Sequence, residues 1–134
     1  MNFALDENLP PSFAVALDAL SGPQGHPVAH LRSIVRRGTH DTVWIKVLAA
    51  QGPHAIVSGD RRMLTRQHEL KALRDAKLTS FVLAVGWSPL PFWEKAWLLV
   101  RWWPTIVDHA TRHPDGVIFM VPHRQMPRAL QEVR

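Results

Sequence analysis

The sequence contains no cysteine, and this absence removes several kinds of site at once. None of its 134 residues can form a disulfide, bind zinc through a thiolate or act as a cysteine nucleophile. A chain without disulfides fits a reducing compartment. We therefore expect a cytoplasmic protein.

Long hydrophobic runs are also missing. Residues 1–7 carry acids where a secretory signal would place positive charge. The most apolar later stretch, residues 93–107, is interrupted by three charged residues and Pro104. It falls short of the roughly 20 apolar residues that a membrane span needs. We expect neither export by a signal peptide nor a membrane partner.

Positive charge is present in modest excess. Sixteen Lys and Arg against eleven Asp and Glu give a formal net charge of +5, which favours anionic partners such as nucleic acid. The apolar fraction of 46% and the charged fraction of 20% are those of an ordinary globular protein. We expect a single domain over residues 1–134, with a loose basic tail over residues 122–134.

Short apolar runs alternate with amphipathic segments along the whole chain. This alternation predicts a three-layer α/β fold, in which helices cover both faces of a parallel or mostly parallel sheet. Pro104 is expected to kink the last helix or to start a new one. Strands are predicted near residues 3–5, 28–31, 55–58, 80–85 and 116–121, and helices near residues 11–20, 41–48, 65–76 and 90–111.

Three aspartates fall at the ends of these predicted elements. Asp6 follows the first strand, Asp60 follows the third, and Asp41 begins the helix that leads into the third. Ligands of parallel sheets bind beyond the carboxyl ends of the strands. Carboxylates that converge there repel one another unless a cation neutralises them, and Mg²⁺ or Mn²⁺ prefers such oxygen ligands. The predicted chemistry is metal-assisted phosphodiester hydrolysis, with these aspartates as catalytic, metal-binding residues.

Each aspartate alone also has an ordinary structural explanation, because Asp commonly caps helices and forms turns. The joint prediction is stronger because several arginines lie in the adjoining loops and the first helical turn, where they would bind the phosphates of a nucleic acid. These arginines are Arg32, Arg36, Arg37, Arg61, Arg62 and Arg66.

Five short segments are more specific than any single residue. They read DENLPP (6–11), GHPVAHLR (25–32), DTVWI (41–45), VSGD (57–60) and GWS (86–88), the last before a tryptophan-rich helix. Together they resemble the PIN-like ribonuclease domains and, within them, the VapC-type toxins of bacterial toxin–antitoxin pairs. The resemblance covers nearly all of residues 3–120.

The resemblance implies a five-stranded sheet with the strand order 3-2-1-4-5 and a divalent-metal site. It also implies an endoribonuclease that a partner antitoxin holds in check. Asp6, Asp41 and Asp60 stand where such domains keep their metal-binding acids. Glu7 occupies a place where relatives often have Asn or Asp, and it is a further candidate ligand.

Departures from the family pattern leave other interpretations open. Thr42 and Val43 stand where acids are expected after Asp41, which leaves the fourth ligand open. Glu69 is an auxiliary candidate, although its helical position favours a solvated face. A catalytically inactive module that binds nucleic acid or a protein is the main alternative. A third interpretation keeps the chemistry and changes the substrate to DNA or structured RNA.

Histidine and tryptophan are abundant, but most of them have structural explanations. His109 and His113 share one helical face, yet the glutamate of a zinc-protease motif is missing, which favours a polar surface. Five tryptophans lie between residues 87 and 103. A helix with tryptophans on more than one face cannot bury all of them. Those left exposed are predicted to contact the antitoxin or a second copy of the chain.

Overall fold

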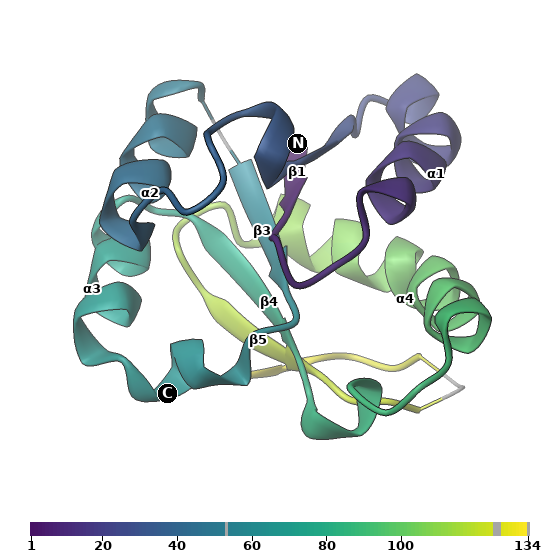
Figure 1. Cartoon of the computed structure of the whole chain (residues 1–134). Coiled ribbons are helices and arrows are strands. Elements are labelled where there is room, and N and C mark those ends of the chain that lie inside the picture. Colours follow the sequence, from purple (N-terminus) through teal and green to yellow (C-terminus); the bar gives the residue numbers. More distant parts are fainter. Residues whose placement is uncertain (53, 125–126, 134) are drawn as a thin grey trace.

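The fold is organised around one sheet, shown in Figure 1. The computed structural model describes residues 1–52, 54–124 and 127–133. Five strands pair in parallel and a short sixth is antiparallel. The strands are β1 (Asn2–Leu5), β2 (Val28–His30), β3 (His54–Ser58), β4 (Thr79–Leu83), β5 (Ile118–Val121) and β6 (Gln131–Glu132).

The strand order corrects one expectation. The class is mostly parallel α/β, as predicted, but the sheet has six strands in the order β2-β1-β3-β4-β5-β6 rather than five in the order 3-2-1-4-5. The expected order is wrong because β1 pairs with both β2 and β3, so the chain passes from β2 across β1 before it adds β3. The order therefore reverses at β1. Such a switch point is where open α/β sheets bind ligands.

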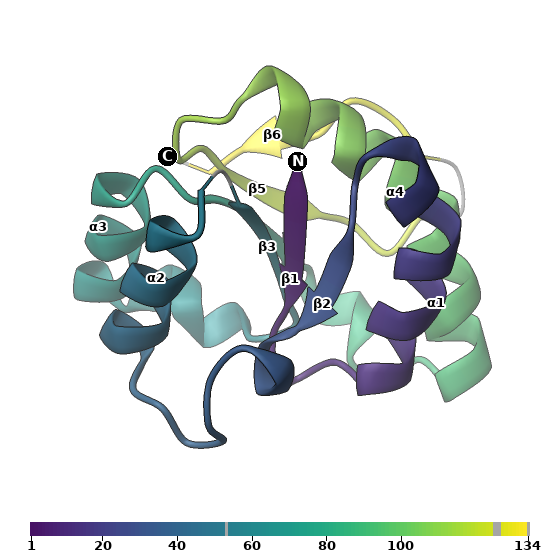
Figure 2. The same ribbon diagram turned by 90° about the horizontal axis from the view of Figure 1, so that it is seen from above.

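Helices cover both faces of the sheet, as Figure 2 shows from above. Successive side chains of β1 point to opposite faces of the sheet. Phe3 and Leu5 pack with α1 and α4 on one face, and Ala4 packs with α2 and α3 on the other. None of the helices in the described ranges combines the length and the apolar character of a membrane span. The helices are α1 (Pro11–Ser21), α2 (Asp41–Ala50), α3 (Gln67–Asp75) and α4 (Phe92–Arg112).

Proline positions shape two of these helices. Pro11 is the first residue of α1, where the missing N–H costs nothing because no carbonyl precedes it in the helix. Pro104 lies inside α4, on its exposed side. The helix continues through it to Arg112, so Pro104 does not begin a new helix as one of the two expectations had it.

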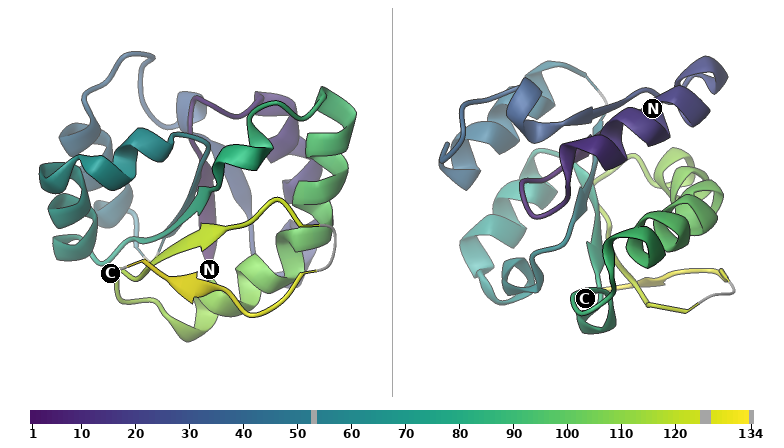
Figure 3. Two further views of the ribbon diagram at one scale, coloured as in Figure 1. Left: turned by 90° about the horizontal axis from the view of Figure 1, so that it is seen from below. Right: turned by 45° about the vertical axis from the view of Figure 1, so that its right-hand side comes forward.

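The C-terminal segment is partly tied to the sheet. We expected residues 122–134 to be loosely held, but β6 pairs with β5 along one edge of the sheet (Figure 3). The backbone N–H of Leu130 also donates to His109 Nε2 at 3.0 Å, which gives this histidine a structural role. Pairing satisfies backbone groups that an uncovered edge strand would leave open. Residues 125, 126 and 134 lie outside the described residues.

The tryptophans of the α4 region divide into buried and exposed groups. Trp87, Trp102 and Trp103 are buried, and each indole N–H donates a hydrogen bond. Trp93 is 79% exposed and Trp97 is 52% exposed. The expectation that one helix cannot bury all of them is therefore confirmed.

Substitution of Trp103 by Phe should lower the free energy of unfolding by about 1 to 3 kcal/mol. The indole N–H of Trp103 donates to the buried Ser21 Oγ at 3.1 Å, and Phe removes this donor as well as part of the packed ring. Urea denaturation measures the change. The matched Trp97→Phe variant, on the exposed side of the same helix, should change stability by less than about 0.5 kcal/mol. Equal losses in the two variants would contradict this assignment.

Candidate active site

Asp6 is a buried acid at the carboxyl end of β1. Its backbone N–H donates to Val57 O at 3.1 Å, which continues the pairing of β1 with β3. Its side chain accepts hydrogen bonds from the Ser58 hydroxyl and from the backbone N–H groups of Asn8 (3.0 Å) and Gly59 (3.4 Å). Burial raises the pKa of Asp6, and these hydrogen bonds oppose the rise. The carboxyl group is thus held in one orientation.

Asp60 follows β3 and caps the short helix η3 (Arg61–Thr65). Its carboxylate accepts from the backbone N–H of Arg62 at 3.0 Å and pairs with the side chain of the same residue. Its own backbone N–H donates to Ser58 Oγ at 3.0 Å. Because the Ser58 hydroxyl also donates to Asp6, this one side chain links the two acids.

Asp41 enters the site from α2, as its first residue. Its Oδ1 accepts from the indole N–H of Trp44 at 2.8 Å. Trp44 is buried in the layer formed by α2 and α3. This bond fixes the carboxylate of Asp41 against a rigid part of the core.

Glu69 lies beside these aspartates rather than on a solvated helix face. Its side chain is only 5% exposed. Burial raises the pKa of Glu69, a hydrogen bond with Asp41 adds to the rise, and Arg66 opposes it. The expectation of a solvated glutamate is wrong because α3 packs this face against α2. The sequence did indicate that Glu69 lies on a buried face, since Leu73 and Ala76 follow it at helical spacing.

Arg66 occupies the centre of the acidic group. Its Nη1 lies 3.0 Å from a Glu69 oxygen, 3.6 Å from an Asp41 oxygen and 3.7 Å from an Asp60 oxygen. These acids, Glu69 first, raise the pKa of Arg66. A residue predicted to bind RNA phosphate thus lies within ion-pair distance of three carboxylates in this structure.

All of the predicted acids line one small hollow of about 100 Å³. It opens where the chain leaves β1 and β3, at the switch point of the sheet. Asn8 lies on its rim, and Val35 and Thr39 come from the segment before α2. The acids that line it are Asp6, Glu7, Asp41, Asp60 and Glu69.

Residues 1–85 match a family model described as a PIN-like domain. The chain belongs to the PIN-like domain family. The match covers more than half of the 134 residues and includes every acid of the hollow. PIN-like domains are generally nucleases, so the nuclease-type fold and the acidic edge agree. No curated protein and no solved structure matches the chain.

The acids of this PIN-like domain offer the type of donor atom that a divalent ion binds. They offer only oxygen donors, as Mg²⁺ and Mn²⁺ prefer, and three of them already face a single positive atom, Arg66 Nη1. Within residues 1–52, 54–124 and 127–133, no three acidic or histidine side chains stand as a ready metal site. The carboxylate oxygens therefore fit a divalent ion chemically. In this arrangement the positive charge among them is the Arg66 guanidinium.

The other arginines predicted to bind RNA lie around the carboxyl edge of the sheet, and they differ in their contacts. Arg62 pairs with Asp60 at 3.1 Å, and Arg61 lines a neighbouring pocket. The remaining three are exposed in the segment between β2 and α2, the segment that also supplies Val35 and Thr39 to the hollow. These three are Arg32, Arg36 and Arg37.

Substitution of Arg66 by Gln should raise the affinity for Mn²⁺ by about tenfold, because it removes a cation that competes for the same carboxylates. Titration calorimetry of the metal-free protein measures the change. Arg74→Gln is the matched control, since it removes an exposed charge from α3, the helix that Arg66 precedes, away from the hollow. Arg66 does not compete for the ion if both variants bind Mn²⁺ equally. Melting curves of both variants establish that each is folded.

Proposed function

We propose that this PIN-like domain is a divalent-metal-dependent endoribonuclease that acts as the toxin of a toxin–antitoxin pair. The observation that carries the proposal is the meeting of acids from four separate elements around one hollow at the switch point of the sheet. An acidic cluster of this kind suits the binding of a cation beside a phosphodiester.

Asp6, Asp41, Asp60 and Glu69 would hold the Mg²⁺ or Mn²⁺ ion, with Glu7 as a further candidate. When bound, the ion supplies an activated water and offsets charge on the phosphate oxygens. The protein keeps Asp6 oriented through Ser58 and two backbone N–H groups. These bonds leave little freedom for the carboxyl group to turn away.

The arginines around the hollow would bind the RNA backbone. Arg61 and Arg62 begin η3 beside Asp60, and the exposed loop before α2 supplies Arg32, Arg36 and Arg37. Guanidinium groups match phosphate oxygens in geometry and charge. Arg66 stands among the acids at the same edge.

One observation favours the alternative of a catalytically inactive binding module. Arg66 already pairs with three of the acids, which lowers the need for an ion. A decayed site of this kind would bind RNA or protein without cleavage. It would show no Mn²⁺ binding that depends on Asp6 and Asp41, which calorimetry on Asp6→Asn and Asp41→Asn measures directly.

Substitution of Asp60 by Asn should reduce divalent-ion-dependent RNA cleavage by roughly 100-fold or more, and with it growth arrest on expression. The fold should persist, because an asparagine oxygen can still accept the cap hydrogen bond from the Arg62 N–H. Asp75→Asn is the control, since Asp75 is an exposed acid paired with Lys71 away from the hollow. The proposed mechanism is wrong if the Asp60→Asn protein cuts RNA at the rate of the Asp75→Asn control.

We also propose that the antitoxin covers the exposed hydrophobic stripe of α4, formed by Phe92, Trp93, Trp97 and Val100. The stripe starts in the first turn of α4, which also sends Lys95 to a pocket beside the acidic hollow. A partner seated on this turn would reach the substrate site. Exposed aromatic clusters of this kind mark protein contact surfaces.

The paired substitution Trp93→Ser and Trp97→Ser should weaken binding of the proposed antitoxin by at least about tenfold, because exposed tryptophans carry much of the energy of such contacts. Cleavage by the isolated protein should be unchanged. Sedimentation of the parent protein alone tests the alternative that a second copy of the chain covers the stripe. A parent dimer that the paired substitution dissociates would show that the stripe is a self-association surface instead.

A further inference from the structure

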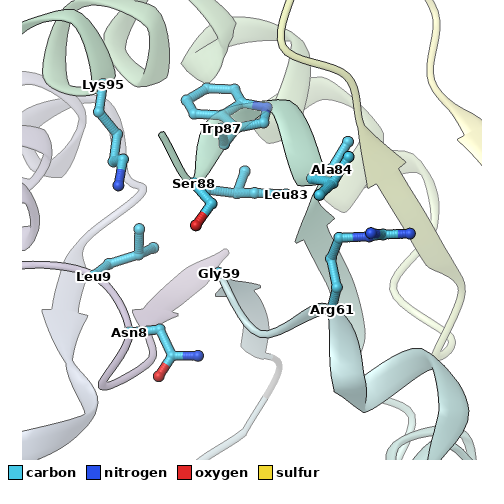
Figure 4. Close-up of a pocket in the computed structure, with 10 residues that line it drawn as sticks. Asn8, Leu9, Gly59, Arg61, Leu83, Ala84, Trp87, Ser88 and Lys95 are labelled. Atoms are coloured by element: carbon cyan, nitrogen blue, oxygen red, sulfur yellow. The ribbon is translucent and has the colours of Figure 1, made fainter. Parts of the chain in front are cut away.

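A second and larger cavity adjoins the acidic hollow. Its volume is about 480 Å³, and it lies beyond the carboxyl ends of β1, β3 and β4 (Figure 4). Asn8 lines both the cavity and the hollow, so the two spaces meet at this residue. A molecule held in the cavity would therefore place its neighbouring group beside the acids.

Gly59 allows this close arrangement of the two spaces. It follows β3 directly, and a Cβ atom at this position would lie 3.3 Å from Asn8 Cβ. A side chain there would crowd the segment after β1. With glycine, the ends of β1 and β3 stay close, and the cavity and the hollow remain neighbours.

The cavity joins an apolar wall to polar and cationic groups. Leu9, Leu83 and Trp87 supply the apolar side. Figure 4 shows the Lys95 amine and the Ser88 hydroxyl pointing into the space. Arg61 comes from η3 on the other side of the cavity, with its guanidinium directed away from Ser88 and Lys95 (Figure 4), and Asn8 lines the end next to the hollow.

This combination matches one nucleotide of a nucleic acid strand. The volume falls within the range of about 300 to 1,000 Å³ that small-ligand pockets have. The Lys95 amine suits phosphate oxygens, the amide and hydroxyl suit a base or ribose edge, and the apolar wall suits the face of a base. A base can enter such a pocket only when it is unpaired, which favours a single strand over a duplex.

We propose that this cavity binds the nucleotide next to the scissile phosphate of a single-stranded RNA. Lys95 holds its phosphate, and Asn8 and Ser88 contact its base or ribose. The inference rests on the proposed endoribonuclease function and adds to it the position of the substrate. It also gives a role to Lys95, which lies in α4, beyond the part of the chain that matches the family model.

The test measures RNA binding without cleavage. The full chain is titrated, in EDTA, with a short fluorescent single-stranded RNA of mixed sequence, at several salt concentrations. Lys95→Gln should weaken binding by about tenfold and flatten the dependence of log affinity on log salt by roughly 0.7 to 1, the value for one phosphate contact. Lys46→Gln is the matched control, because it removes an exposed charge from α2, outside the cavity.

A second variant tests the space rather than the charge. Ser88→Leu fills part of the cavity from an exposed loop position and should weaken RNA binding to a similar degree, with the salt dependence unchanged. Equal affinity of Lys95→Gln and Lys46→Gln would overturn the proposal, as would binding of duplex RNA as tight as binding of the single strand. Either result leaves the proposed function standing if cleavage still depends on Asp60. Loss of the proposed function would appear instead as cleavage that Asp60→Asn does not change.

Discussion

The repulsion among carboxylates at the edge of the sheet is the constraint on which the rest of the site depends. Asp6, Asp41, Asp60 and Glu69 face one hollow, and like charges a few ångströms apart are costly unless they are neutralised. The protein responds in two ways. Burial raises the pKa values of Asp6 and Glu69, and Arg66 places its single charge among three of the acids. One guanidinium leaves this group short of positive charge, which is what a divalent ion would add.

The topology of the sheet creates this constraint. Because the strand order reverses at β1, the segments after β1 and β3 leave the sheet side by side at its carboxyl edge. The first segment carries Asp6 and Asn8, and the second carries Gly59 and Asp60. The acidic hollow and the larger cavity both open at this one place. Two apolar layers, one on each face of the sheet, hold the segments there.

The family match and the rest of the chain contribute different parts. Residues 1–85 match the PIN-like family and contain the acids, whereas α4, β5 and β6 lie beyond the matched part. The helix α4 supplies buried tryptophans to the core, exposed tryptophans to the surface and Lys95 to the cavity. The same helix thus stabilises the core and also lines the cavity beside the acidic hollow.

The sequence by itself determined the α/β class, and it predicted that Asp6, Asp41 and Asp60 meet at one edge of the sheet, where they line one hollow. Short apolar runs that end in Asp6 or Asp60 are local patterns, and a general rule places the ends of parallel strands at one edge. Only the tertiary structure decided the strand order, the pairing of β6, the burial of Glu69 and the place of Arg66 among the acids. The reason is physical: these features depend on which distant elements pack together, and the periodicity of a single segment does not encode its neighbours.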